Sequence, residues 1–251
     1  MMEQMKTNGM AGQDNTVLSG LHSSKQYDQD LEWIRSKVLL MGGLVENQFR
    51  DAMLALERND LSLAEQVRAG DAQVNRQEVE LDHACAQLIV RRQPAANDLR
   101  NVMATVKVIS DLERMGDEAT KIARAVGSIW AGDVLLPEHR NAVIGMSHSA
   151  RRMMRSALDA YARMDTVTAL ELMAMDDTVD AQFHDIVCGL VEYMRRKPDA
   201  VEAGIDLLRA AKAIERIGDH ATNIAEFIIY VVEGKDIRHT DYRVPADGTM
   251  R

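Results

Sequence analysis

The sequence predicts an all-α protein built from two tandem, pseudo-symmetric three-helix bundles. Three observations lead to this fold class. Aromatic residues make up 4% and apolar residues 46% of the 251 residues, and this composition suits helices better than sheets. Apolar residues recur at steps of three and four over long stretches, which is the period of an amphipathic helix. The second part of the chain also repeats the first.

Six helical stretches are expected, one after another. In the first, apolar residues recur on one face from Leu31 to Leu56. Pro94, Pro137 and Pro198 fall between stretches, where they stop or start helices. Since the connections are short, neighbouring helices should be antiparallel. The predicted helices span residues 28–59, 60–92, 97–130, 138–164, 166–196 and 199–233.

The third and sixth stretches resemble each other at an offset of 102 residues. When residues 111–126 are aligned with residues 213–228, 8 of 16 positions are identical. Such self-similarity indicates that three helices are duplicated. We therefore predict a flexible N-terminal tail at 1–26, a first bundle at 27–132, a second bundle at 133–234 and a C-terminal tail at 235–251.

Charge and cysteine content narrow the class of protein. The chain has 39 acidic and 30 basic side chains, a formal charge of −9, which disfavours nucleic acid as a partner because phosphate contacts need a basic face. No apolar run approaches the roughly 20 residues of a membrane span. Cys85 and Cys188 are too few for a disulfide framework, and both are expected to be buried, reduced thiols. We therefore expect a cytoplasmic protein.

An acidic step recurs in both copies of the repeat. Glu113 and Asp117 stand four residues apart in the third stretch, and Glu215 and Asp219 do so in the sixth. Each glutamate falls on a line of apolar and small residues, so its carboxylate lies near a packed seam. Two carboxylates on one helix face repel each other, and partial burial increases the cost. Something must compensate, either the neighbouring Arg114 and Arg216 or a bound cation.

The second and fifth stretches offer further oxygen ligands at helical spacing. These are Asp71, Asn75, Glu78 and Asp82 in one stripe, and Asp176, Asp180 and His184 in the other. Acidic stripes on adjacent helices can surround a hard metal ion such as Mg, Mn, Ca or Fe. His184 shifts the preference of the second site toward Fe or Zn.

Three interpretations of these stripes remain open. A single Glu-x-x-x-Asp step is common on solvated helix faces, but a duplicated one on packing lines favours metal binding. A di-metal oxidase or metal-storage protein of the ferritin type needs Glu-x-x-His steps on two helices, whereas the sequence has one, Glu80 with His83. A helical scaffold without metal is the third.

The duplicated Glu-Arg-x-Gly-Asp sequences at 113–117 and 215–219 resemble the signature of the PhoU family of phosphate-signalling regulators. Residues 41–46, 74–78, 91–94 and 234–239 also look like this family, in the same order. The resemblance implies two three-helix bundles with multinuclear metal clusters, in a cytoplasmic, non-enzymatic homodimer. It implies partners as well: the ATPase subunit of the high-affinity phosphate ABC transporter and a sensor histidine kinase, with peripheral association at the membrane and repression of the phosphate regulon when phosphate is plentiful.

Carried over by position, the resemblance also assigns metal ligands. The implied pairs are Glu113 with Asp117, Glu215 with Asp219, Asp176 with Asp180, Asp71 with Asn75, and Glu78 with Asp82. At Asn75 an amide replaces the second carboxylate of the family motif, which weakens the charge of the first site. The implied metal is Fe, Zn, Mn or Mg.

Overall fold

The computed structural model describes the backbone of residues 14–237 and the side chains of residues 25–237. This part of the chain contains six α-helices, two short 3-10 helices and no strand. The α-helices are α1 (Asp14–Arg58), α2 (Leu61–Arg92), α3 (Asn97–Ile129), α4 (Pro137–Arg163), α5 (Thr166–Arg196) and α6 (Val201–Glu233). The predicted fold class is confirmed.

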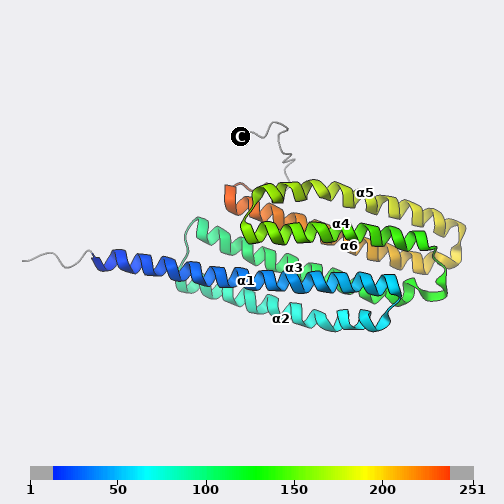
Figure 1. Ribbon diagram of the computed structural model, residues 1–251, viewed down its shortest axis with the longest axis horizontal. Coiled ribbons are helices and arrows are strands. Elements are labelled where there is room, and N and C mark those ends of the chain that lie inside the picture. The colour runs from blue at the N-terminus through cyan, green and yellow to red at the C-terminus, as the bar shows by residue number, and fades with distance from the viewer. Residues whose placement is uncertain (1–13, 238–251) are drawn as a thin grey trace, which may run out of the picture.

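The helices run along one common long axis (Figure 1). Helices α1–α3 pack on one another, and α4–α6 do the same. The two groups lie side by side because α3 packs along α6, and α1 contacts α4. Helices α2 and α5 therefore lie on the two outer sides of the molecule.

The predicted N-terminal tail is wrong for residues 14–26. Helix α1 begins at Asp14 rather than near Asp28, and it continues beyond the packed part of the bundle (Figure 1). The Gly, Ser, Asn and Thr residues of this segment are poor helix formers, which is why the sequence predicts a tail. Extending an existing helix, however, requires no new nucleation. Residues 1–13 of the predicted tail lie outside the described residues.

At the other end, α6 stops at Gly234, whose φ of 75° is in the left-handed region that glycine adopts readily. Within the tail predicted at 235–251, residues 235 and 236 are exposed, but Ile237 is only 3% exposed and packs into the core. Residues 238–251 lie outside the described part of the chain.

The two outer helices begin with the same capping chemistry. The Asp60 carboxylate accepts a hydrogen bond from the backbone N–H of Leu63 at 2.9 Å, at the start of α2. Asp165 accepts from Val167 and Thr168 at the start of α5. Such caps satisfy backbone donors that have no partner within the helix. The two caps fix the first turns of α2 and α5, which are the helices that carry the outer acidic stripes.

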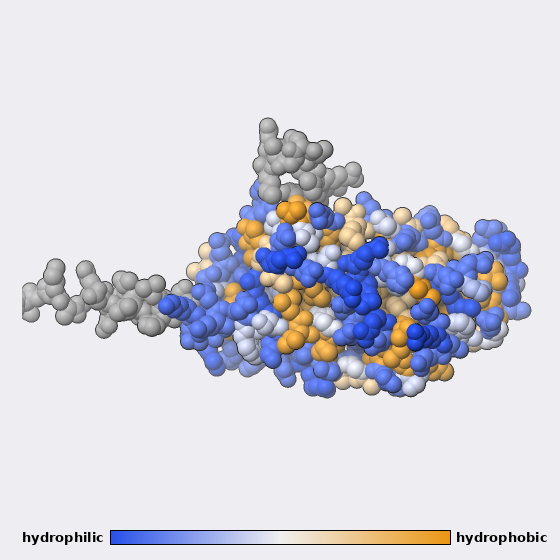
Figure 2. Space-filling model, in the orientation of Figure 1, coloured by the Kyte–Doolittle hydropathy of each residue, from blue (hydrophilic) through white to orange (hydrophobic). Residues whose placement is uncertain are grey.

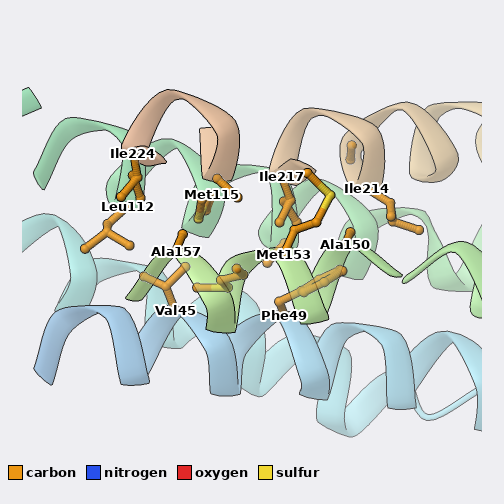
Figure 3. Packing of buried hydrophobic residues seen from close by; sticks show 14 of the residues in the cluster. Val45, Phe49, Leu112, Met115, Ala150, Met153, Ala157, Ile214, Ile217 and Ile224 are labelled. Atoms are coloured by element: carbon orange, nitrogen blue, oxygen red, sulfur yellow. The ribbon is translucent and has the colours of Figure 1, made fainter. Parts of the chain in front are cut away.

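One hydrophobic core extends through both repeats. Figure 3 shows Val45 of α1, Leu112 of α3, Met153 of α4 and Ile217 of α6 pointing toward one another, and all four are fully buried. The predicted division near residue 132 therefore separates two halves that share a core.

Outside the core, the face formed by α1 and α4 is largely polar with scattered apolar residues (Figure 2). Within residues 14–237, no helix combines the length and the apolar composition of a membrane span. Cys85 is buried as expected, but Cys188 is exposed, because it lies on the solvent side of α5.

Candidate metal centre

The second repeat brings three predicted ligands together. Asp180 comes from α5, and Glu215 and Asp219 come from successive turns of α6. One carboxylate oxygen of each lies within 4.8 Å of the others. Among the residues that the structure describes, this is the only group of three or more carboxylate, His or Cys side chains that is close enough to share a metal ion. We call Asp180, Glu215 and Asp219 the acidic triad.

Asp176 lies one turn before Asp180 and extends the triad into the protein. Burial, followed by the charges of Asp180 and Asp219, raises the pKa of Asp176 from 3.8 to about 6, and the nearby Thr222 hydroxyl acts in the opposite direction. The Oδ1 atom of Asp176 is enclosed and has no hydrogen-bond partner of normal geometry among the described residues. Enclosed polar atoms nearly always have a partner, so this oxygen is suited to a bound cation.

The triad has an internal counter-charge that the sequence analysis missed. Lys212 Nζ donates to Glu215 Oε1 at 2.6 Å. Burial and the charge of Glu215 raise the pKa of both Asp180 and Asp219, and Lys212 acts in the opposite direction. Lys212 stands three residues before Glu215, a spacing that brings side chains together on a helix and that could have identified it.

Arg216, one of the two predicted counter-charges, is not used in this way. Its Nη1 atom lies 3.3 Å from Glu118 Oε1 on α3, across the boundary between the repeats. That carboxylate also receives Lys121 at 2.8 Å. Arg216 pairs with Glu118 because it directly follows Glu215 in the sequence, and consecutive residues of a helix lie on different sides of it.

The first repeat gathers its acids more loosely. Burial raises the pKa of Glu113, and the charges of Asp117, Glu78 and Asp71 raise it further. Arg114 opposes them, as predicted. Burial also raises the pKa of Glu78 and that of Asp82, the remaining predicted ligand of α2. These carboxylates are therefore electrostatic neighbours without forming a compact triad.

Two differences separate the first site from the second. Asn75, the counterpart of Asp180, is exposed and carries an amide. Asp71, the counterpart of Asp176, accepts hydrogen bonds from Gln48 at 3.3 Å and from Thr120 at 3.2 Å. Both bonds are made to the Oδ1 atom of Asp71, which therefore has partners within the protein. Gln48 is a polar residue within the apolar face of α1, a signal that the sequence analysis did not use.

The predicted histidine ligand is not part of the centre. His184 lies on α5 with its Nε2 atom 3.6 Å from Cys188 Sγ, and the acidic triad does not include it. The His184 side chain is exposed on α5.

Acids of both repeats nevertheless reach a shared space. An open hollow of about 660 Å³ lies along α3 and α6, where Asp117 and Asp219, with Asp176 of α5, line it together with Arg114 and Arg216. Since α3 and α6 are the duplicated helices, the two predicted sites lie on either side of one seam.

A family model described as PhoU domain matches residues 38–126 and 143–228, one match for each repeat. The chain belongs to the PhoU family. A Pseudomonas putida relative, named phosphate-specific transport system accessory protein PhoU homolog, is 44% identical over 87% of this chain and 85% of its own length. The Escherichia coli (strain K12) protein named phosphate-specific transport system accessory protein PhoU is 41% identical over 87% of this chain and 90% of its own.

Solved structures of other PhoU proteins have the same fold. The crystal structure of PhoU from Pseudomonas aeruginosa is similar with a TM-score of 0.80 and 42% identity, covering 83% of this chain and all of that one. The Streptococcus pneumoniae phosphate transport system regulatory protein PhoU gives a TM-score of 0.78 at 26% identity, covering 84% and 98% of the two chains.

Proposed function

We propose that this protein regulates phosphate uptake as a non-enzymatic adaptor. In this role it contacts the ATPase subunit of the high-affinity phosphate ABC transporter and a sensor histidine kinase, and it represses the phosphate regulon when phosphate is plentiful. The observation that carries the proposal is the similarity to phosphate transport accessory proteins over 87% of the chain, which includes both acidic repeats. The protein acts in the cytoplasm as a homodimer and reaches the membrane through its partners.

The oxidase alternative receives no support from the geometry. Glu80 and His83, the single Glu-x-x-His step, are both exposed on α2. Di-metal oxidases instead project such steps into the interior of the bundle. Oxygen consumption by iron-loaded protein separates the two functions: the adaptor consumes none, whereas turnover would support the oxidase.

We also propose that a multivalent metal ion, Fe, Zn, Mn or Mg, is held by the acidic triad with Asp176. Clustered carboxylate oxygens are the donors that hard cations prefer, and the unpartnered oxygen of Asp176 fits the same use. The ion would neutralise mutually repelling carboxylates and join α5 to α6. Glu113, Asp117, Asp71, Asn75, Glu78 and Asp82 would form a second, weaker site.

Deletion of the gene tests the regulatory proposal. Alkaline phosphatase activity in high phosphate should rise in the deletion strain and return to a low level when the intact chain is supplied. Low activity in the deletion strain would contradict the proposal. Light scattering of the purified protein would test the homodimer.

A further inference from the structure

A second hollow lies on the seam between α3 and α6, next to the one that the acids line. Its volume is about 440 Å³, within the range of small-molecule sites. Its charged lining residues are Lys121 and Arg124 of α3, Arg209, Lys212 and Arg216 of α6, and two carboxylates, Glu118 and Asp206. We call it the basic hollow. Five cations facing two anions are unusual in a chain whose formal charge is −9.

The carboxylates position the cations without neutralising them all. Glu118 is only 5% exposed, and it holds Lys121 and Arg216, which come from different repeats. Asp206 holds Arg209 at 2.7 Å, and Lys212 is paired with Glu215 of the acidic triad at 2.6 Å. Arg124 has no ion-pair or hydrogen-bond partner among the described residues. The hollow therefore keeps excess positive charge on side chains that remain accessible to solvent.

The internal repeat does not account for this charge. At the offset of 102 residues, the counterparts of Lys121 and Arg124 are Asn223 and Glu226, and the counterpart of Lys212 is Ser110. The pseudo-symmetric position on the other side of the seam thus lacks three of the five cations. Because both repeats adopt the same fold, the fold does not require these three cations. The positive charge is therefore specific to the basic hollow.

We propose that the basic hollow binds a triphosphate chain. Arginine guanidinium groups match phosphate oxygens in a bidentate geometry, and lysines add point charge. The cations of α6 extend from Arg209 to Arg216, which at the helical rise is about 10 Å and is longer than a single phosphate group requires. None of the described residues lining the hollow is aromatic, so no surface is offered for stacking a nucleobase.

The inference stands apart from the proposed adaptor role, because it concerns binding by the isolated protein. Calorimetry measures the binding of inorganic tripolyphosphate to chelator-treated protein in metal-free buffer. Under these conditions no metal is bound at the acidic triad, so binding to the basic hollow is measured alone. We expect saturable binding that weakens as salt is added. ATP should bind no more tightly than tripolyphosphate. No binding of tripolyphosphate, or a clear preference for ATP or for an acidic peptide, would overturn the proposal.

Matched double variants locate the site. Arg124→Gln with Arg209→Gln removes two charges from the hollow, and both side chains are exposed, so the fold should be kept. The control, Arg68→Gln with Arg196→Gln, removes two exposed arginines of α2 and α5 that likewise form at most short-range helical pairs. We expect the first pair to weaken binding by about tenfold or more and the control by less than about twofold. Equal losses would show that binding follows net charge and would overturn the assignment.

Discussion

Replacing Asp176 by Asn should stabilise the metal-free protein near neutral pH. In the native state, burial and two neighbouring carboxylates raise the pKa of Asp176 from 3.8 to about 6. The native state therefore holds the proton of Asp176 more tightly than the unfolded state does. Its ionisation is unfavourable to folding: the cost is absent below about pH 4, grows as pH rises, and is complete above about pH 6.

The magnitude follows from the size of the shift. A change from 3.8 to about 6 corresponds to at most about 3 kcal/mol. Because Asp176 is only partly buried, solvent screening reduces this to about 1–2 kcal/mol. The neutral amide of the Asp176→Asn variant avoids the cost, so the free energy of unfolding should rise by about 1–2 kcal/mol at about pH 7 and stay unchanged at about pH 4.

Urea denaturation in the presence of a chelator, at these two pH values, measures the difference. Asp71→Asn is the matched control, because Asp71 is the counterpart of Asp176 and accepts hydrogen bonds from Gln48 and Thr120. That variant should lose about 1 kcal/mol, since a charged acceptor is replaced by a neutral one. A destabilised Asp176→Asn, or a gain of equal size at both pH values, would refute the reasoning.

Further predictions concern the seam, the glycines and the first acidic site. Glu118→Gln should cost about 1–2 kcal/mol in urea denaturation because it weakens two ion pairs of a buried carboxylate, one with Lys121 on α3 and one across the seam with Arg216. The control Glu65→Gln, at an exposed ion pair with Arg68, should change stability by less than about 0.5 kcal/mol, and equal effects would count against the cross-seam role of Glu118. Gly218→Ala should raise the melting temperature through a helix-propensity gain of up to about 1 kcal/mol, since a Cβ there meets its nearest neighbours at 3.6 Å. Gly116→Ala should gain less or lose, because its Cβ would lie 3.2 Å from Gln48 Oε1; a larger gain at Gly116 would contradict this packing. Asn75→Asp should increase metal binding by the first repeat in equilibrium dialysis, and an unchanged affinity would show that Asn75 is not the limiting difference.

Much of the fold could be predicted because its signals are local and repeated. The steps of three and four that begin at Leu31 place buried residues on one face of α1, and Val38, Val45 and Phe49 are fully buried as expected. The start of α1 could not be predicted in the same way. The residues before Asp28 have poor helix propensity, and their helical state depends on the helix that follows them.

The sequence predicts which carboxylates form the candidate site, but not every contact that the charged residues around it make. Glu215 and Asp219 are visible as a repeated step in the sequence, and the structure joins them to Asp180. Lys212 reaches Glu215 within α6, at a spacing that the sequence shows, but the partner of Arg216 depends on how α3 and α6 are packed, because Arg216 crosses the seam to Glu118. A periodic pattern gives the side of a helix on which a residue lies, but not which helix covers that side.

The measurement that tests the central claim most directly is the metal content of three chelator-treated proteins after equilibrium dialysis against the same metal. The three are the unchanged chain, Glu215→Gln with Asp219→Asn in the second repeat, and Glu113→Gln with Asp117→Asn in the first. The compact triad predicts that the second-repeat variant loses most of the bound metal and that the first-repeat variant retains most of it. Equal retention by both variants, or no metal on the unchanged chain, would contradict the account.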